Sequence, residues 1–456
     1  MLRHPSSYRD PSGFIFKENN KVYRQINPVF FDEYKAAVSA GIYNSLFDKK
    51  WLVRHKEISS DSSRIVLEPV PLDFITYPYE WSFTQYKHAA QLTLRLQIWL
   101  LENNFSLKDA TAFNVTFQKG KAIFIDTLSI EQYKINTPWR GLKQFNEHFF
   151  GPLLLAQYHG SLHLKTLQHS INGIDLNVVK RQLPFISRFN PTVYSHIYLL
   201  SKSEAENDNK EGGSDRSVEL SKARQIKMLS ALEMYIDGME SKENTEWSKY
   251  YSETNYNKKS FKFKKDLIVK WNKELNSKKV IDLGGNDGTF GKELLPQIDQ
   301  LIVCDIDQPA IDQCYLEHIK NDSSKLTCLV NDLLQPSPAI GFNSQERASF
   351  NSRVIDFAPD LSMALALIHH ITLSGNVPFE MSAQYFSQLS KYLIIEFPDR
   401  EDSWVEFILN SKREARHLFD DYTISAFAKA YQKYFNLIKS EKIQGTARTL
   451  FLFQRL

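Results

Sequence analysis

The chain has 456 residues, which is too long for one ordinary hydrophobic core, so we expect two or three domains. Hydrophobic residues make up 42% and charged residues 24%, the balance of a soluble globular protein, and a net charge of +3 does not indicate a nucleic-acid partner. The polar N-terminus lacks the apolar core of a signal peptide, and no run approaches the roughly 20 apolar residues of a membrane-spanning helix, so neither is expected.

The first 200 residues predict an α+β domain. Alternating hydrophobicity around a polar turn predicts a hairpin over Gly13–Ile26. A helix is predicted over Phe31–Asn44, a strand over Arg64–Leu67, and a long, strongly periodic helix over Thr84–Glu102. The segment between this strand and the long helix is rich in aromatic residues, which we interpret as packing residues because no basic patch accompanies them.

Three polar residues follow the long helix at a distinctive spacing. Asn114 comes five residues after Asp109, and Asp126 ends a second predicted strand twelve residues further on. The segment Ser106–Ser129 resembles the catalytic loop of protein-kinase-like phosphotransferases. The resemblance implies that Asp109 takes a hydroxyl proton while Asn114 and Asp126 hold magnesium on the phosphates.

The same region departs from the kinase pattern. The hairpin lacks a glycine-rich loop, and Arg24 stands where a phosphate-binding lysine is expected. Lys108 is an unusual residue before the catalytic Asp, and Thr127 and Leu128 are unusual after the metal-binding Asp. We therefore expect a degenerate kinase-like module that binds a substrate or a partner. An active phosphotransferase and a two-strand turn with incidental Asp and Asn residues are the alternatives.

A polar stretch separates the two halves of the chain. Ser201–Arg216 is dense in Ser, Asn, Gly and charged residues, so we expect a connector. Apolar spacing predicts a helix over Val218–Ile236. The basic run Lys258–Lys265 is typical of a solvated helix face, with contact to an anionic substrate or membrane surface as the alternative. The division expected is a domain over 1–200, a connector with a helical lead-in over 201–264, and a second domain over 265–456.

From Lys279 onward, strand and helix patterns alternate with short loops, which predicts a mostly parallel sheet. The strands expected are Val280–Leu283, Leu301–Cys304, Leu326–Val330, Leu361–Leu367, Tyr392–Glu396, Asn436–Lys439 and Thr449–Phe453. The helices expected are Thr289–Gln297, Ala310–Lys320, Met381–Ser390, Trp404–Phe419 and Ser425–Tyr434. The last two strands should pair antiparallel, so we expect an α/β, Rossmann-like domain with seven strands.

The segment Val280–Gly291, VIDLGGNDGTFG, joins the first of these strands to a glycine-rich turn. Gly284 and Gly288 let the backbone approach a ligand, because no Cβ lies in the way. A dinucleotide-binding loop needs glycines at positions 284, 286 and 289, where this chain has Gly, Asn and Thr. The spacing of small residues is closer to that of methyltransferases, and a glycine turn in another doubly wound domain is the alternative.

Acidic residues accompany the first three strands. Asp282 lies on the first strand, Asp305 ends the second, and Asp332 follows the third. A carboxylate at position 305 suits the two ribose hydroxyls of an adenosine, although Asp307 could take its place or cap the next helix. With these positions in order and a hairpin at the end of the sheet, the C-terminal half resembles class I S-adenosylmethionine-dependent methyltransferases.

This resemblance implies S-adenosylmethionine as the cofactor. Asp282 would orient the methionine amino group through the loop, and Asp332 with the next backbone N–H would meet the adenine edge. The residues expected to bind the cofactor are Asp282, Gly284, Gly285, Asn286, Gly288, Asp305, Ile306, Asp332 and Leu333.

Two histidines and a glutamate are the candidate catalytic residues. His369 and His370 follow the fourth strand, where the sulfonium of the cofactor should point, and a neutral imidazole can take a hydroxyl proton. We favour His369, with packing or substrate positioning as the alternative. Glu396 ends the fifth strand, with a helix-capping or salt-bridge role as its alternative. Because no Asn/Asp-Pro-Pro-Tyr element follows the fourth strand, methylation of a nucleobase or amide nitrogen is not expected.

Three segments resemble more closely the bacterial methyltransferases of the nodulation-protein (host-specificity, NoeA-like) type. They are DLLQPSPAIGFNSQERASF at 332–350, LALIHHI at 365–371 and IIEFPDREDSWVEFIL at 394–409. In that resemblance, residues 345–347 form part of a loop over the active site. The substrate of the group does not follow from the resemblance.

The sequence as a whole predicts a cytoplasmic enzyme that methylates an oxygen of a small molecule or a glycan, with a nitrogen as the alternative acceptor atom. Its three cysteines, at positions 304, 314 and 328, lack metal-ligand spacing, so we expect reduced, buried thiols and no zinc site. Two alternatives remain: a bifunctional enzyme that also transfers phosphate, and a catalytically silent scaffold that binds the cofactor.

Overall fold

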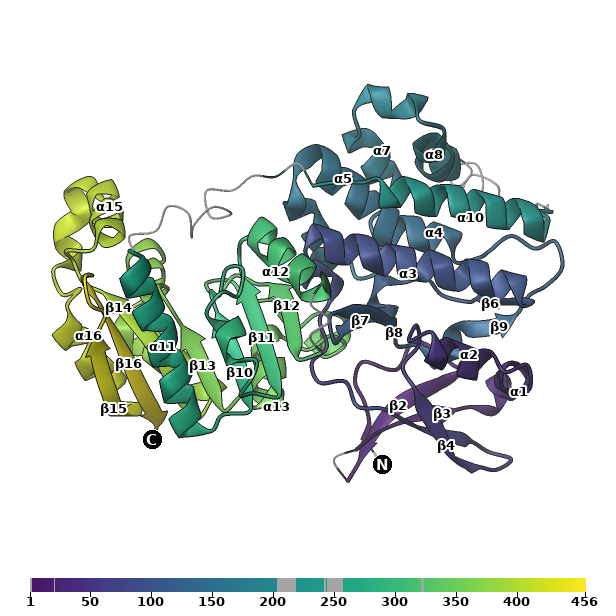
Figure 1. Cartoon of the computed structure of the whole chain (residues 1–456). Coiled ribbons are helices and arrows are strands. Elements are labelled where there is room, and N and C mark those ends of the chain that lie inside the picture. The colour runs from purple at the N-terminus through teal and green to yellow at the C-terminus, as the bar shows by residue number, and fades with distance from the viewer. Residues whose placement is uncertain (1, 20, 203–218, 242, 244–256, 321–323) are drawn as a thin grey trace. The chain divides into compact units, whose positions relative to one another are not determined.

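The computed structural model of the chain describes residues 2–19, 21–202, 219–241, 243, 257–320 and 324–456 (Figure 1). The chain forms two compact units: unit 1 comprises Met1–Glu243 and Ala339–Ala348, and unit 2 comprises Asn244–Pro338 and Ser349–Leu456. The boundaries therefore differ from those expected at 200 and 265, and a short piece of the C-terminal half belongs to unit 1. The predicted connector Ser201–Arg216 lies, except for its first two residues, outside the described part of the chain.

Unit 1 begins with a five-stranded antiparallel sheet in the order β1-β2-β3-β5-β4. Its elements are β1 Leu2–Arg3, β2 Gly13–Glu18, β3 Lys21–Ile26, α1 Phe31–Ser39, α2 Ile42–Asp48, β4 His55–Ser60 and β5 Ile65–Pro69. The predicted hairpin is confirmed. The single helix predicted over Phe31–Asn44 is wrong, because Gly41 takes a left-handed conformation with φ of 71° and separates two helices. The polar, largely exposed strand β4 has no counterpart in the sequence prediction.

The rest of unit 1 is mainly helical and is organised around α3 (Phe83–Glu102), which is confirmed. The hydroxyl of Ser82 accepts a hydrogen bond from Gln85 N–H, and the Gln85 side chain accepts one from Ser82 N–H, so both residues cap the helix. Two short antiparallel pairs follow: β6 (Phe105–Leu107) with β9 (Ile130–Gln132), and β7 (Val115–Gln118) with β8 (Lys121–Phe124). The other α-helices in the described part of unit 1 are α4 Leu142–Phe145, α5 Gly151–His159, α6 Thr166–His169, α7 Leu176–Gln182, α8 Pro191–Val193 and α10 Lys222–Asp237.

The helix α10 belongs to unit 1 rather than to a lead-in for the second domain. It lies along α3 (Figure 1), where Arg95 pairs with Glu233 at 2.7 Å and the Gln91 amide donates a 2.8 Å hydrogen bond to Asp237. Its apolar residues Leu229 and Leu232 are fully buried. The apolar spacing predicted the helix, but this spacing does not identify the neighbouring element.

Unit 2 contains a seven-stranded sheet in the order β12-β11-β10-β13-β14-β16-β15. The pairs among the first five strands are parallel, and the β14–β16 and β15–β16 pairs are antiparallel. The strands are β10 Lys279–Leu283, β11 Gln300–Asp305, β12 Leu326–Val330, β13 Leu361–Ala364, β14 Tyr392–Pro398, β15 Phe435–Lys442 and β16 Arg448–Arg455. Each expected strand is present, and the antiparallel end of the sheet is the arrangement that the class I methyltransferase resemblance implies.

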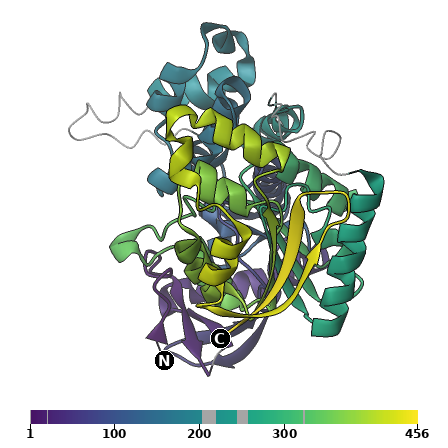
Figure 2. The same ribbon diagram turned by 90° about the vertical axis from the view of Figure 1, so that its left-hand side faces the viewer.

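Helices cover both sides of this sheet. They are α11 Lys258–Leu275, α12 Gln308–Lys320, α13 Phe350–Phe357, α14 Phe379–Leu389, α15 Ser403–Ser411 and α16 Ile424–Tyr431. Figure 2 shows α11 on one side of the sheet and α14 and α16 on the other. The helix predicted over Thr289–Gln297 is only a short 3-10 turn, Gly291–Leu294, because Pro296 cannot continue a helix. The helix predicted over Trp404–Phe419 ends early, since Arg413 has a φ of 50°.

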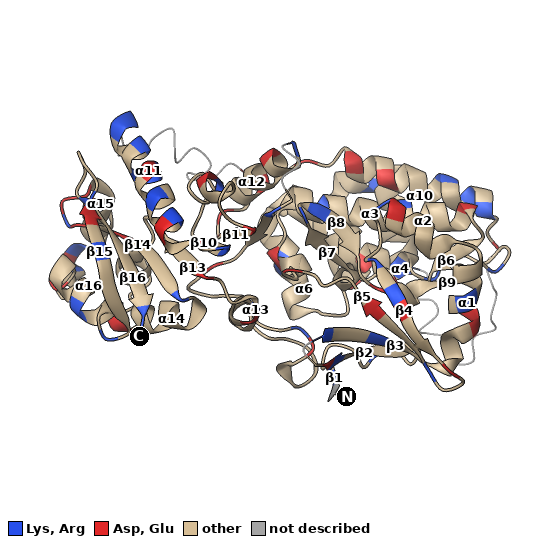
Figure 3. Ribbon diagram, turned by 60° about the horizontal axis from the view of Figure 1, so that its bottom comes forward, with Lys and Arg blue, Asp and Glu red and all other residues tan. Residues whose placement is uncertain are grey.

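The predicted basic run Lys258–Lys265 forms the first turns of α11, which is an amphipathic helix. Lys258, Lys259 and Lys262 are exposed as predicted, and Figure 3 shows basic residues along the helix. Lys264 is buried instead, on the same face as Leu267, Ile268 and Trp271. No helix within the described ranges is long and apolar enough to cross a membrane.

Candidate functional site

A cavity of about 280 Å³ lies in unit 2 where the parallel strands β10, β11, β12 and β13 end. The carboxyl ends of such strands are the usual ligand site in an open α/β sheet. The cavity is lined by eight of the nine residues predicted to bind the cofactor, namely Asp282, Gly284, Gly285, Asn286, Asp305, Ile306, Asp332 and Leu333. It is also lined by Lys264, Phe290, Asn331, Leu334, Leu365, Ala366, Leu367, His370, Ile371 and Ser374.

The glycine-rich turn brings the backbone to the wall of the cavity. Gly284 has a φ of 69°, and a Cβ there would lie 2.9 Å from Leu367 Cδ1. A Cβ on Gly285 would lie 2.8 Å from the carboxyl carbon of Asp282. Both positions therefore need glycine. Of the nine predicted residues, Gly288 does not line the cavity. Its φ is 77°, and a Cβ there would lie 3.1 Å from Cys314 Sγ. This glycine therefore allows the conformation of the turn and its close packing against Cys314.

Asp282 presents a buried carboxylate to the cavity. Its side chain is 1% exposed, and among the described residues no side chain donates a hydrogen bond to either carboxylate oxygen. Burial raises the pKa of Asp282 to about 7, although Lys264 and the Gly291 backbone N–H act in the opposite direction. A buried carboxylate of this kind is suited to a cationic ligand group that donates hydrogen bonds.

Asp305 is fixed at the end of β11 by backbone donors. Its carboxylate accepts hydrogen bonds from Asn286 N–H at 2.8 Å and from Asp307 N–H at 2.9 Å. Burial raises the pKa of Asp305 to about 6, and these backbone hydrogen bonds oppose the rise. Asp307 itself accepts a hydrogen bond from Ala310 N–H and begins α12, which is the capping role considered for it.

The residues after β12 form a further wall. Asp332 lines the cavity and accepts a 2.8 Å hydrogen bond from Leu334 N–H. Its neighbour Asn331, which sequence reasoning missed, is buried, and its Oδ1 accepts a 3.2 Å hydrogen bond from Ser337 N–H. The Nδ2 of Asn331 has no hydrogen-bond partner within the described chain, so it can donate to a ligand. The sequence could have indicated Asn331 as a cavity residue, because Asn331 and Asp332 directly follow a predicted strand.

The two histidines face different surroundings. The chain turns sharply after β13, where Ala366 has a φ of 49°. His370 lines the cavity, whereas His369 is 1% exposed and is not among the lining residues. Burial lowers the pKa of His370 to about 4, and the positive charge of Arg448 adds to this. The structure therefore favours His370 over His369 as the group that faces a ligand, contrary to our preference from the sequence.

Glu396 is a structural ion-pair residue in this arrangement. It is fully buried and absent from the cavity lining. Its carboxylate lies 2.5 Å from the ammonium of Lys264 and 3.5 Å from the guanidinium of Arg448, and it accepts a hydrogen bond from Ala366 N–H at 3.0 Å. A carboxylate held by two cations is a poor base, so these contacts support the salt-bridge alternative for Glu396.

The loop predicted to cover the active site belongs to unit 1. The carboxylate of Glu346 is 1% exposed and accepts hydrogen bonds from Tyr8 Oη at 2.8 Å and Arg9 Nε at 2.7 Å. The guanidinium of Arg347 lies over the ring of Phe113 at 4.7 Å. These partners all lie in unit 1, and none of residues 345–347 is among the residues that line the cavity of unit 2.

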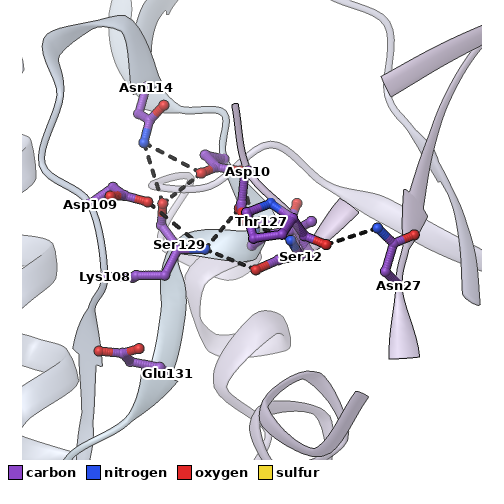
Figure 4. Close-up of polar contacts among 12 residues, drawn as sticks. Asp10, Ser12, Asn27, Lys108, Asp109, Asn114, Thr127, Ser129 and Glu131 are labelled. Carbon is purple, nitrogen blue, oxygen red and sulfur yellow. Dashed lines mark hydrogen bonds and ion pairs between the residues drawn. The ribbon is translucent and has the colours of Figure 1, made fainter. Parts of the chain in front are cut away.

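The three residues of unit 1 on which the kinase resemblance rests lie close to one another. The Nδ2 of Asn114 lies 3.4 Å from Asp126 Oδ2 and 3.3 Å from Ser129 Oγ, with Asp109 nearby (Figure 4). The hydroxyl of Ser129 donates a 2.6 Å hydrogen bond to Asp126, and Arg24 pairs with the other Asp126 oxygen at 2.6 Å. Asp126 thus already has cationic and hydroxyl partners within the chain.

Two carboxylates in and beside this cluster, those of Asp126 and Asp10, are paired with the basic side chains of Arg24 and Lys108. Burial alone would raise the pKa of Asp126, but Arg24 and Ser129 together hold it below its usual value. Lys108 pairs with Asp10 at 2.8 Å and also donates to Ser12 (Figure 4). Among the residues that the structure describes, no group of three His, Cys, Asp or Glu residues could hold a metal ion.

Comparison with known proteins places the chain in a family. No family model matches it. It is 30% identical to nodulation protein NoeA of Rhizobium meliloti (strain 1021) over 467 residues, which covers 99% of this chain and 96% of that protein. The chain belongs to the NoeA family of nodulation proteins. Since the alignment runs over the full length, both units are shared with that relative.

Solved structures of lower similarity match parts of the chain. The N-methyltransferase NodS from Bradyrhizobium japonicum is 12% identical and matches 44% of this chain and 98% of that one, with a TM-score of 0.32. The magnesium protoporphyrin IX methyltransferase of Synechocystis with bound S-adenosylhomocysteine is 14% identical and matches 46% of this chain and 93% of that one, also at 0.32. With scores this low, we base the fold of unit 2 on its own strand order.

Proposed function

We propose that unit 2 binds S-adenosylmethionine and transfers its methyl group to an acceptor. The observation that carries this proposal is the meeting of three features in one cavity: a glycine turn with positive φ, the buried carboxylate of Asp282, and the edge carboxylate of Asp305. A ligand with an ammonium group, a ribose and an apolar aromatic base is complementary to all three.

Each part of this ligand has a partner in the proposal. Asp282 would bind the α-ammonium of the methionine moiety, and Asp305 would accept hydrogen bonds from the two ribose hydroxyls. The adenine would lie between Ile306 and Leu333 and meet the polar groups of Asn331 and Asp332. The bound cofactor supplies a methyl group activated by its sulfonium charge.

The acceptor would enter beside His370. The wall there is otherwise apolar, with Leu334, Leu365 and Ile371, and it includes the hydroxyl of Ser374. With a pKa of about 4, His370 is neutral at pH 7 and can accept a hydrogen bond from an acceptor hydroxyl, which would orient that hydroxyl toward the methyl group. We propose an oxygen of a small molecule or glycan as the acceptor, with rate enhancement mainly from holding donor and acceptor in line.

A calorimetric titration with S-adenosylhomocysteine tests the cofactor site. We expect micromolar binding to the wild-type protein and an affinity at least about tenfold weaker for Asp305→Ala, which corresponds to about 1.4 kcal/mol. The matched control is Asp299→Ala, because Asp299 is exposed and lies just before β11, outside the cavity. Absence of binding to the wild-type protein would rule out the proposed function.

We further propose that unit 1 is a degenerate kinase-like module with a binding role. Its support is the sheet order, with α1 and α2 inserted between β3 and β4, and the cluster of Asp109, Asn114 and Asp126 after α3. Against phosphoryl transfer stands the ion pair of Arg24 with Asp126, the residue that would hold magnesium. A bifunctional phosphotransferase is therefore the less favoured alternative.

A further inference from the structure

Unit 1 carries a cluster of exposed, large apolar side chains that the proposed functions leave without a role. Phe185, Ile186 and Phe189 lie in one short 3-10 helix, Phe185–Phe189, which we call the apolar turn. Their exposed fractions are 67%, 71% and 72%, although side chains of this type are usually buried. The apolar turn connects α7 with α8, and both helices lie on the opposite side of α3 from the five-stranded sheet (Figure 1). A large apolar cluster at the surface indicates a site of interaction.

The apolar turn is held in place by contacts with the rest of unit 1. Ser187, in its middle, is 2% exposed, and its hydroxyl forms a 2.8 Å hydrogen bond with the Tyr198 hydroxyl. Directly after the turn, Asn190 Oδ1 accepts a 3.1 Å hydrogen bond from Val193 N–H and so caps α8. Because the inward residues are fixed in this way, the three large apolar side chains remain on the outside of the fold.

Basic residues accompany the apolar turn. The sequence from 176 to 202 contains four Lys and Arg residues and no Asp or Glu. Lys180 and Arg181 lie in the last turn of α7, shortly before the apolar turn. The guanidinium of Arg188 lies over the ring of Phe185 at 5.0 Å and over that of Tyr198 at 5.3 Å. This segment of unit 1 therefore combines exposed apolar side chains with positive charge.

We propose that the apolar turn inserts into the surface of an anionic lipid bilayer. Phe and Ile side chains gain free energy at the boundary between headgroups and acyl chains, and nearby Lys and Arg residues are attracted by negative headgroups. The aliphatic stems of Lys180 and Arg181 allow their charged ends to reach the headgroups while the turn is inserted. Such binding is peripheral and reversible, because only three large apolar side chains enter the lipid. This proposal does not depend on the proposed function of either unit.

The size of the apolar turn favours a bilayer over a protein partner. Three large side chains present on the order of a few hundred Å² of apolar surface. Each side of a stable protein interface buries about 800 Å², which is more than this turn offers. A bilayer needs no matching surface of that size, because lipid surrounds the inserted side chains on all sides. The absence of acidic residues from 176–202 agrees with attraction to an anionic surface.

Vesicle flotation with the full-length protein tests this proposal. One set of vesicles contains phosphatidylcholine alone, and the other contains phosphatidylcholine with about 30% phosphatidylglycerol, which supplies the negative surface charge. We expect the wild-type protein to bind the anionic vesicles at least about tenfold more tightly than the neutral ones. A rise in salt concentration should weaken binding to the anionic vesicles, because salt screens the attraction to the headgroups.

Two variants separate the apolar from the electrostatic contribution. The triple variant Phe185→Ser/Ile186→Ser/Phe189→Ser should bind the anionic vesicles at least about tenfold more weakly than the wild-type protein, because the inserted side chains are lost. The double variant Lys180→Gln/Arg181→Gln should lose about fivefold in affinity for each charge removed, and only with the anionic vesicles. Since the three apolar side chains are exposed, the triple variant should keep the wild-type unfolding temperature, measured by circular dichroism.

Matched controls come from unit 2. Phe407→Ser/Leu418→Ser removes two apolar side chains that are about as exposed as those of the apolar turn, and Lys258→Gln/Lys259→Gln removes two exposed charges from α11. Both control variants should bind the anionic vesicles as the wild-type protein does.

Three outcomes would overturn the proposal. The first is a wild-type protein that does not bind the anionic vesicles, and the second is a triple variant that binds them as tightly as the wild-type protein. The third is self-association of the wild-type protein that is lost in the triple variant, without binding to vesicles. Sedimentation velocity measures this self-association, which would assign the apolar turn to a contact between two copies of the chain.

Discussion

At the residue scale, the cavity of unit 2 combines groups whose charges are set by burial. Asp282 and Asp305 have raised pKa values, of about 7 and about 6, because both are withdrawn from water. His370 has a lowered pKa for the same reason. Burial thus favours the neutral form of each group in the free protein, and a ligand of complementary charge would restore the charged form of the two carboxylates.

The raised pKa of Asp282 predicts a pH-dependent affinity for S-adenosylhomocysteine. The ligand ammonium requires the ionised carboxylate, so we expect binding to be about tenfold weaker at pH 6 than at pH 8, mostly through Asp282. Calorimetry at both pH values measures this. In Asp282→Asn, binding should be weak at both values, with only the smaller dependence that Asp305 contributes.

The same pKa has a consequence for folding. Because the folded-state pKa of Asp282 lies above its ordinary value of 3.8, its contribution to stability is fully present below pH 3.8 and is lost as pH rises through about 7. The free Asp282→Asn variant should therefore be the more stable protein at pH 8, although it binds the ligand poorly. A wild-type affinity that did not change between pH 6 and pH 8 would contradict the assignment of Asp282 to the ammonium.

At the element scale, substitution of two glycines in the left-handed conformation distinguishes the effect of a Cβ on backbone stability from its effect on ligand binding. Gly284 (φ 69°) lies in the cavity wall and Gly41 (φ 71°) lies between α1 and α2 in unit 1, where a Cβ would meet nothing within 4 Å. A left-handed conformation costs a residue with a Cβ about 1–2 kcal/mol. Both Gly284→Ala and Gly41→Ala should therefore lower the free energy of unfolding by about this amount.

Only Gly284→Ala should also weaken binding of S-adenosylhomocysteine, because its Cβ would crowd Leu367 at the cavity wall. Denaturant unfolding and calorimetric titration of the two variants measure the two effects. Equal affinity of both variants for the ligand would place the glycine turn outside the binding surface.

At the scale of the whole molecule, the relative that defines the family aligns with both units. Unit 1 is therefore shared with that relative, as unit 2 is, although the cluster of Asp109, Asn114 and Asp126 has contacts that argue against phosphoryl transfer. Arg24 pairs with Asp126, and Asn114 lies within 3.4 Å of the same carboxylate, so the positions that would hold magnesium are bound to each other.

We accordingly expect no ATP turnover by the full-length protein in the presence of Mg²⁺. Release of inorganic phosphate and transfer of the γ-phosphoryl group are the measurements, with S-adenosylhomocysteine binding to the same sample as the control for folding. ATP turnover that disappears in Asp126→Ala would instead establish a bifunctional enzyme.

Local patterns in the sequence were sufficient to predict many of the strands, helices and cavity residues of unit 2. The alternation of apolar strands and helices predicted all seven strands, and the positions of Gly284, Asp305 and Asp332 after these strands indicated eight of the residues that line the cavity. These features are readable because each depends on a few adjacent residues. In parallel strands, residues that follow the strand ends meet at one edge of the sheet, which makes their proximity predictable.

Only the tertiary structure decided which charged residues are buried and with which partners. Lys264 and Glu396 are 132 residues apart, and nothing in a basic run or a strand end indicates that they form an ion pair beside the cavity. Likewise, the choice between His369 and His370 depends on a turn at Ala366, and the place of α10 beside α3 depends on packing between distant segments. Burial and pairing are properties of the assembled fold, so the sequence alone determined most of the elements of unit 2, while the structure determined which side chains line its cavity.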